Sequence, residues 1–312
     1  MDTPSEEALR YLDIVFVVDC TSSMEPYIEE VKMKAISMIK RIEENAIGPQ
    51  VNFGVVVYGD HPPEDDLLTR SFGPTGDHAL IKRNIKDLPL SGGGDLPEAV
   101  ADGLHAGIEA DWREGAAKVM ILVGDAPPHG YAKEMPDSES EMEDSFPDGC
   151  PCGLNPVEEA RRAGKMGITI HAVGVDPGPV VETAFKQIAL VTEGSYFTLD
   201  NAEKLTELVL EMVQRELDLM KTDIAVFKSV EKSRTNDADQ LSASLGISRV
   251  EAERAMTRLR TRGVIREEDG PERLGTAVEL EGGNASRRFC RYCGSQVLSH
   301  AAFCRNCGRR LG

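Results

Sequence analysis

One short run of residues restricts the fold more than any other feature of the chain. Residues 12–18 read Leu-Asp-Ile-Val-Phe-Val-Val, which is almost continuously apolar and rich in β-branched side chains. Such a run is typical of a strand buried on both faces, as in a parallel sheet. Apolar residues then recur at helical spacing from Ile28 to Ile42. The chain therefore begins with the strand–helix pattern of an α/β fold.

The same alternation continues to about residue 220. Further strands are predicted at residues 51–58, 67–72, 118–123, 168–173 and 195–198, of which 67–72 is a shorter run expected at an edge of the sheet. Further helices are predicted at residues 77–88, 97–110, 156–166, 180–191 and 203–220. Strands that alternate with helices predict a doubly wound, mainly parallel, Rossmann-like sheet covered on both sides. Ligands of such sheets bind beyond the carboxyl ends of the strands.

Composition predicts how the rest of the chain is divided. The stretch 132–155 is acidic and poor in apolar residues, which predicts an exposed, partly disordered insertion in a first domain of residues 1–220. The parts expected after it are a winged helix-turn-helix-like domain at 221–280, a flexible linker at 281–286 and a metal module at 287–312. Within the second domain, helices are predicted at 222–232, 237–245 and 248–262, and wing strands at 264–265 and 277–280.

Charge is distributed unevenly along the chain. The net charge of −18 comes from the acidic first domain, whereas residues 286–312 contain six arginines and no acidic residue. An acidic body repels nucleic acid, so only the C-terminal part is suited to bind it. The N-terminus lacks the basic and apolar runs of a signal peptide, and no apolar stretch is long enough to cross a bilayer. We therefore expect a cytoplasmic protein with no membrane partner.

Oxygen-bearing side chains gather at three points where strands end or helices begin. They are Asp19, Thr21 and Ser23 after the first strand, Asp95 after a Gly-rich loop, and Asp125 after the strand at 118–123. Carboxylates and hydroxyls are hard ligands that suit Mg²⁺, Mn²⁺ or Ca²⁺. The three segments are expected at one edge of the sheet, so the sequence predicts one divalent metal site there.

The motif Val-Val-Asp19-Cys-Thr21-Ser-Ser23-Met resembles the metal-ion-dependent adhesion site of von Willebrand factor A domains. The resemblance covers residues 12–220 and implies a doubly wound fold with the metal at the carboxyl end of the sheet. It also implies that Asp19 acts through water, that Thr21 and Ser23 ligate directly, and that Asp125 is the third-loop aspartate. Domains of this family commonly hold a protein partner through the metal.

The second loop departs from the family pattern. Asp95 stands where the family usually has a threonine, and an extra carboxylate weakens the attraction of the ion for a partner's carboxylate. The segments around Asp125 and His129, and then Cys150 and Cys152, resemble an intracellular subgroup whose A domain is joined to an alpha-kinase. The remaining residues contain no recognisable kinase catalytic region, so the resemblance does not extend to kinase activity.

Helix capping is the alternative explanation for these acidic residues. Asp19 and Thr21 are also common helix caps, and Asp95-Leu-Pro-Glu98 fits the start of a helix with a capping box. Each segment alone is consistent with either reading. The occurrence of all three between the expected strands favours the metal site.

A second, softer metal site is a further hypothesis. His61 lies in a loop at the same predicted edge, and His129, Cys150 and Cys152 complete a mixed nitrogen and sulfur set of the kind that zinc uses. The alternative is a loop histidine with two free thiols.

The C-terminal cysteines give a stronger zinc signal. They form two Cys-x-x-Cys pairs ten residues apart, at Cys290, Cys293, Cys304 and Cys307. Four thiolates suit a tetrahedral Zn²⁺ and leave no open position for catalysis. The spacing resembles a zinc ribbon.

Two functions are consistent with this set of features. The first is a non-enzymatic scaffold that holds a protein partner through the metal. The alternative is a nucleic-acid-associated transcriptional regulator that contacts phosphates through Arg249, Arg254 and Arg258 of the predicted recognition helix and through the zinc ribbon. Neither a phosphate-binding loop nor a nucleophile with its base is evident beside the metal motif, so we do not expect an enzyme.

Overall fold

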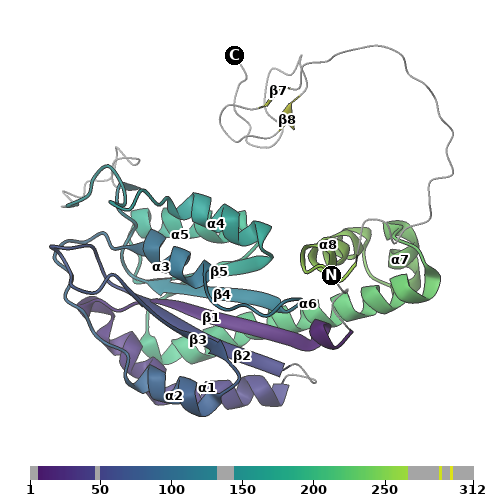
Figure 1. Cartoon of the computed structure of the whole chain (residues 1–312), viewed down its shortest axis with the longest axis horizontal. Helices are drawn as coiled ribbons and strands as arrows, with labels where there is room; N and C mark the ends of the chain where they lie inside the picture. Colours follow the sequence, from purple (N-terminus) through teal and green to yellow (C-terminus); the bar gives the residue numbers. More distant parts are fainter. Residues whose placement is uncertain (1–5, 46–49, 132–143, 266–287, 290–295, 298–312) are drawn as a thin grey trace. The chain divides into compact units, whose positions relative to one another are not determined.

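The computed structural model describes residues 6–45, 50–131, 144–265, 288–289 and 296–297 (Figure 1). The chain divides into two units, Met1–Pro271 and Glu272–Gly312. The second unit contains the short antiparallel pair β7 (Arg288–Phe289) and β8 (Gln296–Val297). All other elements described below belong to the first unit.

A six-stranded sheet forms the centre of the first unit, in the order β3-β2-β1-β4-β5-β6. The strands are β1 (Tyr11–Asp19), β2 (Gln50–Tyr58), β3 (Thr69–Thr75), β4 (Ala117–Gly124), β5 (Ile168–Val175) and β6 (Tyr196–Leu199). All neighbouring pairs are parallel except β2 with β3, which places the antiparallel strand at an edge. The predicted doubly wound, mainly parallel sheet is confirmed.

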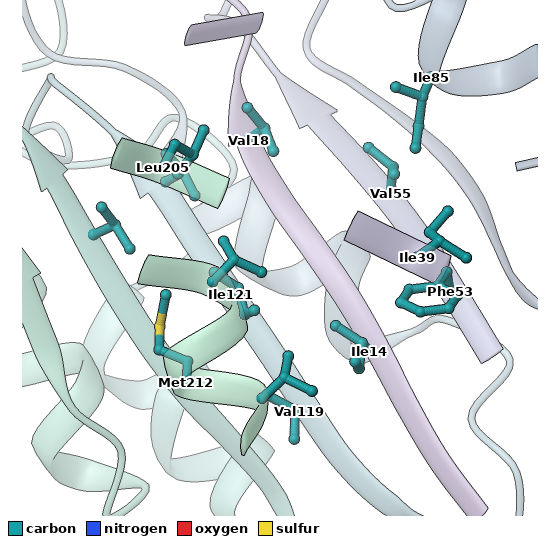
Figure 2. Packing of buried hydrophobic residues seen from close by; sticks show 14 of the residues in the cluster. Ile14, Val18, Ile39, Phe53, Val55, Ile85, Val119, Ile121, Leu205 and Met212 are labelled. Atoms are coloured by element: carbon teal, nitrogen blue, oxygen red, sulfur yellow. The ribbon is translucent and has the colours of Figure 1, made fainter. Parts of the chain in front are cut away.

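Helices α1 (Glu25–Asn45), α2 (His78–Lys86) and α6 (Leu205–Ser233) cover one face of the sheet (Figure 1). Figure 2 shows the core between them, where Ile14 and Val119 of the central strands lie near Ile39 of α1 and Met212 of α6. The β-branched strand residues identified in the sequence supply the sheet side of this core. Packing of the β1 side chains against these helices fixes the orientation of the strand and the position of its carboxyl end.

Helices α3 (Val100–Ile108), α4 (Pro156–Lys165) and α5 (Pro179–Val191) cover the opposite face. Helix α3 approaches the sheet closely because it carries glycine where it crosses the strands. A Cβ added to Gly103 would lie 2.6 Å from the Tyr58 ring, and one added to Gly107 would lie 2.8 Å from Met120. The fully buried Tyr58 therefore lies between α3 and the sheet.

The residues after the sheet form a small helical cluster. Helix α7 (Ala238–Leu245) ends at Gly246, whose positive φ allows the turn, and α8 (Arg249–Thr261) begins with a capping box at Ser248. Leu9, from the short 3₁₀ segment η1 (Glu6–Arg10), is buried in the same core as Val226, Leu241 and Leu259. The first and last described parts of this unit thus share one core.

Three expectations for this region were wrong. The helices predicted at 203–220 and 222–232 are one continuous helix, α6, which runs through Lys221 and Thr222. Val250, expected on the buried face of α8 with Met256 and Leu259, is 54% exposed, while the other two are buried. The wing strand predicted at 264–265 is a turn with buried side chains, and its partner at 277–280 lies outside the described residues.

Candidate metal centre

Asp19 is the last residue of β1 and its side chain is fully buried. One carboxylate oxygen, Oδ1, accepts hydrogen bonds from the Thr21 backbone N–H at 2.9 Å and from Thr21 Oγ1 at 2.6 Å. These bonds turn the loop back over the end of the strand. The second oxygen, Oδ2, is buried and has no hydrogen-bond partner among the described residues.

Ser23 and Asp125 complete this group. Thr21 Oγ1 lies 3.3 Å from Ser23 Oγ, and Ser23 hydrogen-bonds to Asp125, which directly follows β4. Asp125 Oδ1 is also buried without a partner in the described part of the chain. Gly124 allows the close approach, because a Cβ there would lie 3.3 Å from Asp19 Cβ and 2.6 Å from Tyr58 Oη. The ends of β1 and β4 thus bring four predicted site residues together.

Asp95 lies in a neighbouring group of side chains. Its Oδ2 accepts a 2.6 Å hydrogen bond from the Ser145 backbone N–H, and its ligand atoms lie within 4.8 Å of those of His129 and Asp144. Asp60 lies close enough to help raise the pKa of Asp95, and its Oδ1 lies 2.6 Å from His129 Nε2. Asp95 therefore borders the Asp19 group from the side of residues 144–145.

Glu98 is a buried residue of this centre that the sequence reading treated only as a helix cap. It is 3% exposed, and its Oε2 has no hydrogen-bond partner within the described ranges. A Cβ added to Gly93 would lie 3.1 Å from Glu98 Oε1 and 3.5 Å from Thr21 Cβ, so the Gly-rich loop packs between these two residues. The signal available in the sequence was the carboxylate three residues beyond Asp95.

The acidic side chains of the centre do not cap the neighbouring helices. Helix α3 has Ala99 as its N-cap and no side-chain cap hydrogen bond, so neither Asp95 nor Glu98 caps it. Thr21 precedes the short 3₁₀ turn η2 (Ser22–Met24), also without a side-chain cap bond. Capping therefore does not account for the position of these side chains.

The electrostatics of the centre are those of buried negative charge. Burial, reinforced by Asp125, raises the pKa of Asp19 to about 7. Burial, reinforced by Asp19 and Asp60, raises the pKa of Glu98 to about 10. A buried ionised carboxylate costs much free energy unless a cation or hydrogen bonds compensate it. The free oxygens, buried walls and hard donors together fit a divalent ion.

The softer set predicted from the sequence is divided between two clusters. Ligand atoms of His61, Cys150 and Cys152 lie within 4.8 Å of one another and of Asp102, a residue of α3 that the sequence reading did not include. His129 instead hydrogen-bonds to Asp60 through Nε2 and to Asp144 through Nδ1. Burial lowers the pKa of His129, but these two hydrogen bonds outweigh it and leave the pKa raised.

The predicted nucleic-acid contacts are engaged within the protein or lie beside a cavity. Arg258 forms an ion pair with buried Asp223 of α6 at 2.6 Å, and Arg249 pairs with Glu253 at 2.9 Å. Arg254 borders a cavity of about 490 Å³ between α8 and the α/β body. The cysteines of the predicted zinc ribbon, Cys290, Cys293, Cys304 and Cys307, lie outside the described residues.

A parallel sheet whose carboxyl edge carries an Asp-x-Thr-x-Ser loop and a third-loop aspartate defines a class of metal-binding α/β domain. The family model of the von Willebrand factor type A domain matches residues 13–211, and the chain belongs to that family. The zinc-ribbon domain family matches residues 289–311.

Similar proteins are known from several sources. The alpha-protein kinase vwkA of Dictyostelium discoideum is 29% identical over 147 residues, which are 47% of this chain and 22% of the kinase. The chain thus spans about a fifth of the length of this curated relative. Among solved structures, proximal thread matrix protein 1 from the mussel byssus is 24% identical, with a TM-score of 0.45 over 66% of this chain and 46% of that chain. The pilus adhesin SpaC of Lactobacillus rhamnosus GG is 17% identical, with a TM-score of 0.47 over 66% of this chain and 30% of that chain.

Among the described residues, none of the helices is both long and apolar enough to span a membrane.

Proposed function

We propose that this domain binds a divalent metal ion at the carboxyl edge of its sheet and uses it to hold a protein partner. Asp19, Thr21, Ser23 and Asp125 hold the ion, and Glu98 and Asp95 lie near enough to shape its electrostatic surroundings. The proposal rests above all on Asp19 Oδ2, a fully buried carboxylate oxygen for which the described residues offer no hydrogen-bond donor.

The type of ion follows from the donor set. Carboxylate and hydroxyl oxygens are hard ligands, which favours Mg²⁺, with Mn²⁺ or Ca²⁺ as alternatives. An ion bound by these side chains would keep a coordination position for an oxygen atom of a partner. The extra carboxylate of Asp95 reduces the net positive charge at that position, so a carbonyl or amide oxygen is a better match than in a less acidic site.

The surroundings of the centre suit a protein partner. Ser23 is exposed, so the group is open to solvent on that side. Leu96, next to Asp95, is 51% exposed, and Leu90, just before the Gly-rich loop, is 40% exposed. Apolar side chains at the rim of a polar metal position allow a partner to bury area around one coordinating atom.

We infer that the centre is a binding site and not a catalytic one. Its described side chains provide metal-type oxygens, whereas the fully buried Tyr58 hydroxyl has its pKa raised well above the usual value by burial and by Asp19, which disfavours it as a nucleophile. The nucleic-acid alternative gains no support from the recognition helix, because Arg258 and Arg249 form ion pairs within the protein.

Affinity capture from native lysate tests the proposed function. The full chain is immobilised in Mg²⁺ buffer, with parallel captures in EDTA, with Asp19→Ala, and after nuclease treatment. Asp66→Ala, which removes an exposed acid from a nearby loop, is the matched control. Proteins that are lost with EDTA and with Asp19→Ala, but kept with Asp66→Ala and with nuclease, support a metal-dependent scaffold.

The opposite pattern contradicts it. If capture is unchanged by EDTA and by Asp19→Ala but is lost after nuclease treatment, the function would lie in the C-terminal modules. That result would favour the nucleic-acid-associated regulator.

A further inference from the structure

A second cluster of metal-ligating side chains lies beside the first turn of α3 and shares no residue with the Asp19 group. It consists of His61, Asp102, Cys150 and Cys152, which come from three separate parts of the sequence. His61 follows β2, Asp102 is in the first turn of α3, and both cysteines belong to the segment before α4. None of these four side chains is used by the proposed partner-binding function, so the inference below does not depend on it.

The ligand atoms of the cluster converge on one point. His61 Nε2 lies 3.0 Å from Asp102 Oδ2 and 3.4 Å from Cys150 Sγ, and Cys150 Sγ lies 3.0 Å from the same Asp102 oxygen. Zinc–ligand bonds of about 2.0–2.3 Å arranged as a tetrahedron separate neighbouring ligand atoms by roughly 3.3–3.8 Å. The observed separations are close to these edges, and a small expansion would admit the ion.

The same geometry argues against a catalytic thiol. In a Cys–His–Asp relay, the cysteine and the aspartate contact different nitrogens of the imidazole. Here Cys150 and Asp102 both contact Nε2 of His61. Two atoms that contact one nitrogen and also each other match ligands around a shared centre and not a chain of proton donors and acceptors.

The backbone around Cys150 is folded as a loop that supports a sulfur ligand. The Cys152 N–H points to Cys150 Sγ at 3.3 Å, and the Leu154 N–H also hydrogen-bonds to Cys150. Backbone donors aimed at sulfur orient a ligating side chain. Gly153, with φ of +74°, closes the turn through its N–H to the Cys150 carbonyl at 2.9 Å.

We propose that His61, Asp102, Cys150 and Cys152 form a structural zinc site. Nitrogen, oxygen and two sulfur ligands are a set that Zn²⁺ accepts, and four protein ligands fill its tetrahedral shell. His61 and Asp102 are buried, 5% and 7% exposed, whereas Cys152 is exposed and gives the ion a path of entry. Because protein side chains fill all four coordination positions, the role of the zinc would be to hold a segment in place and not to catalyse.

The segment that the zinc would fasten is residues 144–155. Phe146 of this segment packs edge-on against both His61 and His129, at centroid distances of 5.7 and 5.0 Å. The same segment supplies the Ser145 N–H to Asp95 and the Asp144 carboxylate to His129. Fixing Cys150 and Cys152 to α3 therefore holds in place one wall of the acidic centre, which is the group of Asp19, Asp95, Glu98 and Asp125.

The zinc content of the full chain tests the proposal once the four cysteines of the expected zinc ribbon have been replaced. The ribbon-silent variant carries serine in place of Cys290, Cys293, Cys304 and Cys307. After dialysis with equimolar Zn²⁺, we expect this variant to retain about one zinc per chain, since four protein ligands complete one site. Adding Cys150→Ser with Cys152→Ser, or adding His61→Gln, should remove it, whereas His105→Gln on the same helix α3 should keep it.

Cobalt provides an optical readout of the same site. Co²⁺ added to the metal-free ribbon-silent variant should give tetrahedral d–d bands and thiolate-to-cobalt charge-transfer absorption. Adding Cys152→Ser should reduce the charge-transfer absorption about twofold, because one of two thiolates is lost. Circular dichroism with Mg²⁺ present checks that each variant is folded.

Two results would overturn the proposal. One is a folded ribbon-silent variant that binds neither Zn²⁺ nor Co²⁺ at stoichiometric concentrations. The other is zinc or cobalt binding that survives the loss of Cys150 and Cys152, which would place the ion elsewhere.

Discussion

At the scale of single residues, the acidic centre depends on a carboxylate that the protein leaves unpaired. Asp19 Oδ2 is buried without a donor in the described part of the chain, and Asp125, Glu98 and Asp60 each have one oxygen in the same condition. Proteins usually satisfy such groups, because each unmade hydrogen bond costs about 1–3 kcal/mol. The protein without metal is therefore strained electrostatically at this edge of its sheet.

Replacing Asp19 should have opposite effects on the stability of the metal-free protein and on its stabilisation by Mg²⁺. In EDTA at pH 8, we expect Asp19→Asn to raise the melting temperature, because the variant no longer buries an unpaired charge. With Mg²⁺ at about 100 times the dissociation constant, the parent should gain about 2.7 kcal/mol, and the variant should gain almost nothing. Thermal denaturation of both proteins, with and without Mg²⁺, measures this. A full Mg²⁺ response in the variant, or none in Asp66→Asn, would contradict the assignment.

The raised pKa values fix the sign of a pH dependence. Burial raises the folded-state pKa of Asp19 from 3.8 to about 7 and that of Glu98 from 4.5 to about 10. The folded state therefore binds these protons more tightly than the unfolded state, and the resulting stability is complete only at low pH. It is lost as the pH rises through about 7 for Asp19 and about 10 for Glu98.

We accordingly expect the metal-free protein to lose stability between pH 5.5 and 8, and the stabilisation by Mg²⁺ to increase over the same range. Urea denaturation in EDTA and in Mg²⁺, repeated at several pH values, measures both trends. Asp19→Asn serves as control, since it should reduce the slope of the metal-free trend to the part that Glu98 contributes. Metal-free stability that rises steadily up to pH 8 would contradict the burial of unpaired carboxylates.

The residues of the centre were only partly predictable. Asp19, Thr21, Ser23 and Asp125 could be identified because they follow strands, and parallel strands end at one edge. Glu98 and Asp102 could not, since acidic residues at the start of a helix are ordinary. Which of them turn inward depends on side chains packed from other parts of the chain, such as Phe146 against His61.

At the scale of elements, α3 connects the two metal-ligating clusters with the sheet. Gly103 lets this helix rest on Tyr58, and the Tyr58 hydroxyl lies beside Gly124 and Asp19. A side chain at Gly103 would therefore displace Tyr58 toward the acidic centre. The position of one helix thus affects the edge where β1 and β4 end.

Gly103→Val tests this packing. We expect it to destabilise the protein by about 1–3 kcal/mol, as overpacked cores do, and to weaken Mg²⁺ binding as well. Gly164→Ala on α4 is the matched control, because a Cβ there would come no closer than 3.8 Å to its neighbours, which is ordinary contact. Denaturant unfolding and calorimetric Mg²⁺ titration measure the two effects. Unchanged stability in Gly103→Val would mean that α3 does not rest on Tyr58 this closely.

Elements were predicted best where hydrophobic periodicity is strong. The strands and helices of the sheet domain lie within a few residues of their predicted positions, since buried runs and amphipathic spacing are local signals. The continuity of α6 was missed because the polar pair Lys221-Thr222 interrupts the apolar pattern, although a helix needs no apolar residue at each turn. Val250 was misplaced because the pattern of α8 alone does not show which face meets α6.

At the scale of the whole unit, a buried ion pair joins the helical cluster to the α/β body. Asp223 of α6 is 2% exposed and accepts from Arg258 and Arg262 of the α8 region. Arg262 also donates to the carbonyl oxygens of Gly115 and Ala8. These contacts reach from the end of α8 to the loop before β4 and to the N-terminal segment.

Arg258→Met should lower the free energy of unfolding by about 3–5 kcal/mol, because it leaves a buried carboxylate with one partner fewer. Arg260→Met, at an exposed position of the same helix, should change it by less than about 0.5 kcal/mol. Denaturant unfolding followed by circular dichroism measures both. Adding Asp223→Leu to Arg258→Met should restore part of the loss, and equal effects of the two arginine variants would show that the ion pair does not join the parts.

The place of Leu9 in the helical core also has a consequence for synthesis of the chain. Leu9 is synthesised before its core neighbours Val226, Leu241 and Leu259, which follow it by more than 200 residues. At a ribosomal rate of about 5–20 residues per second, roughly 10–50 s pass before these neighbours exist. During that interval Leu9 lacks these neighbours, so this core can close only after α8 has been synthesised.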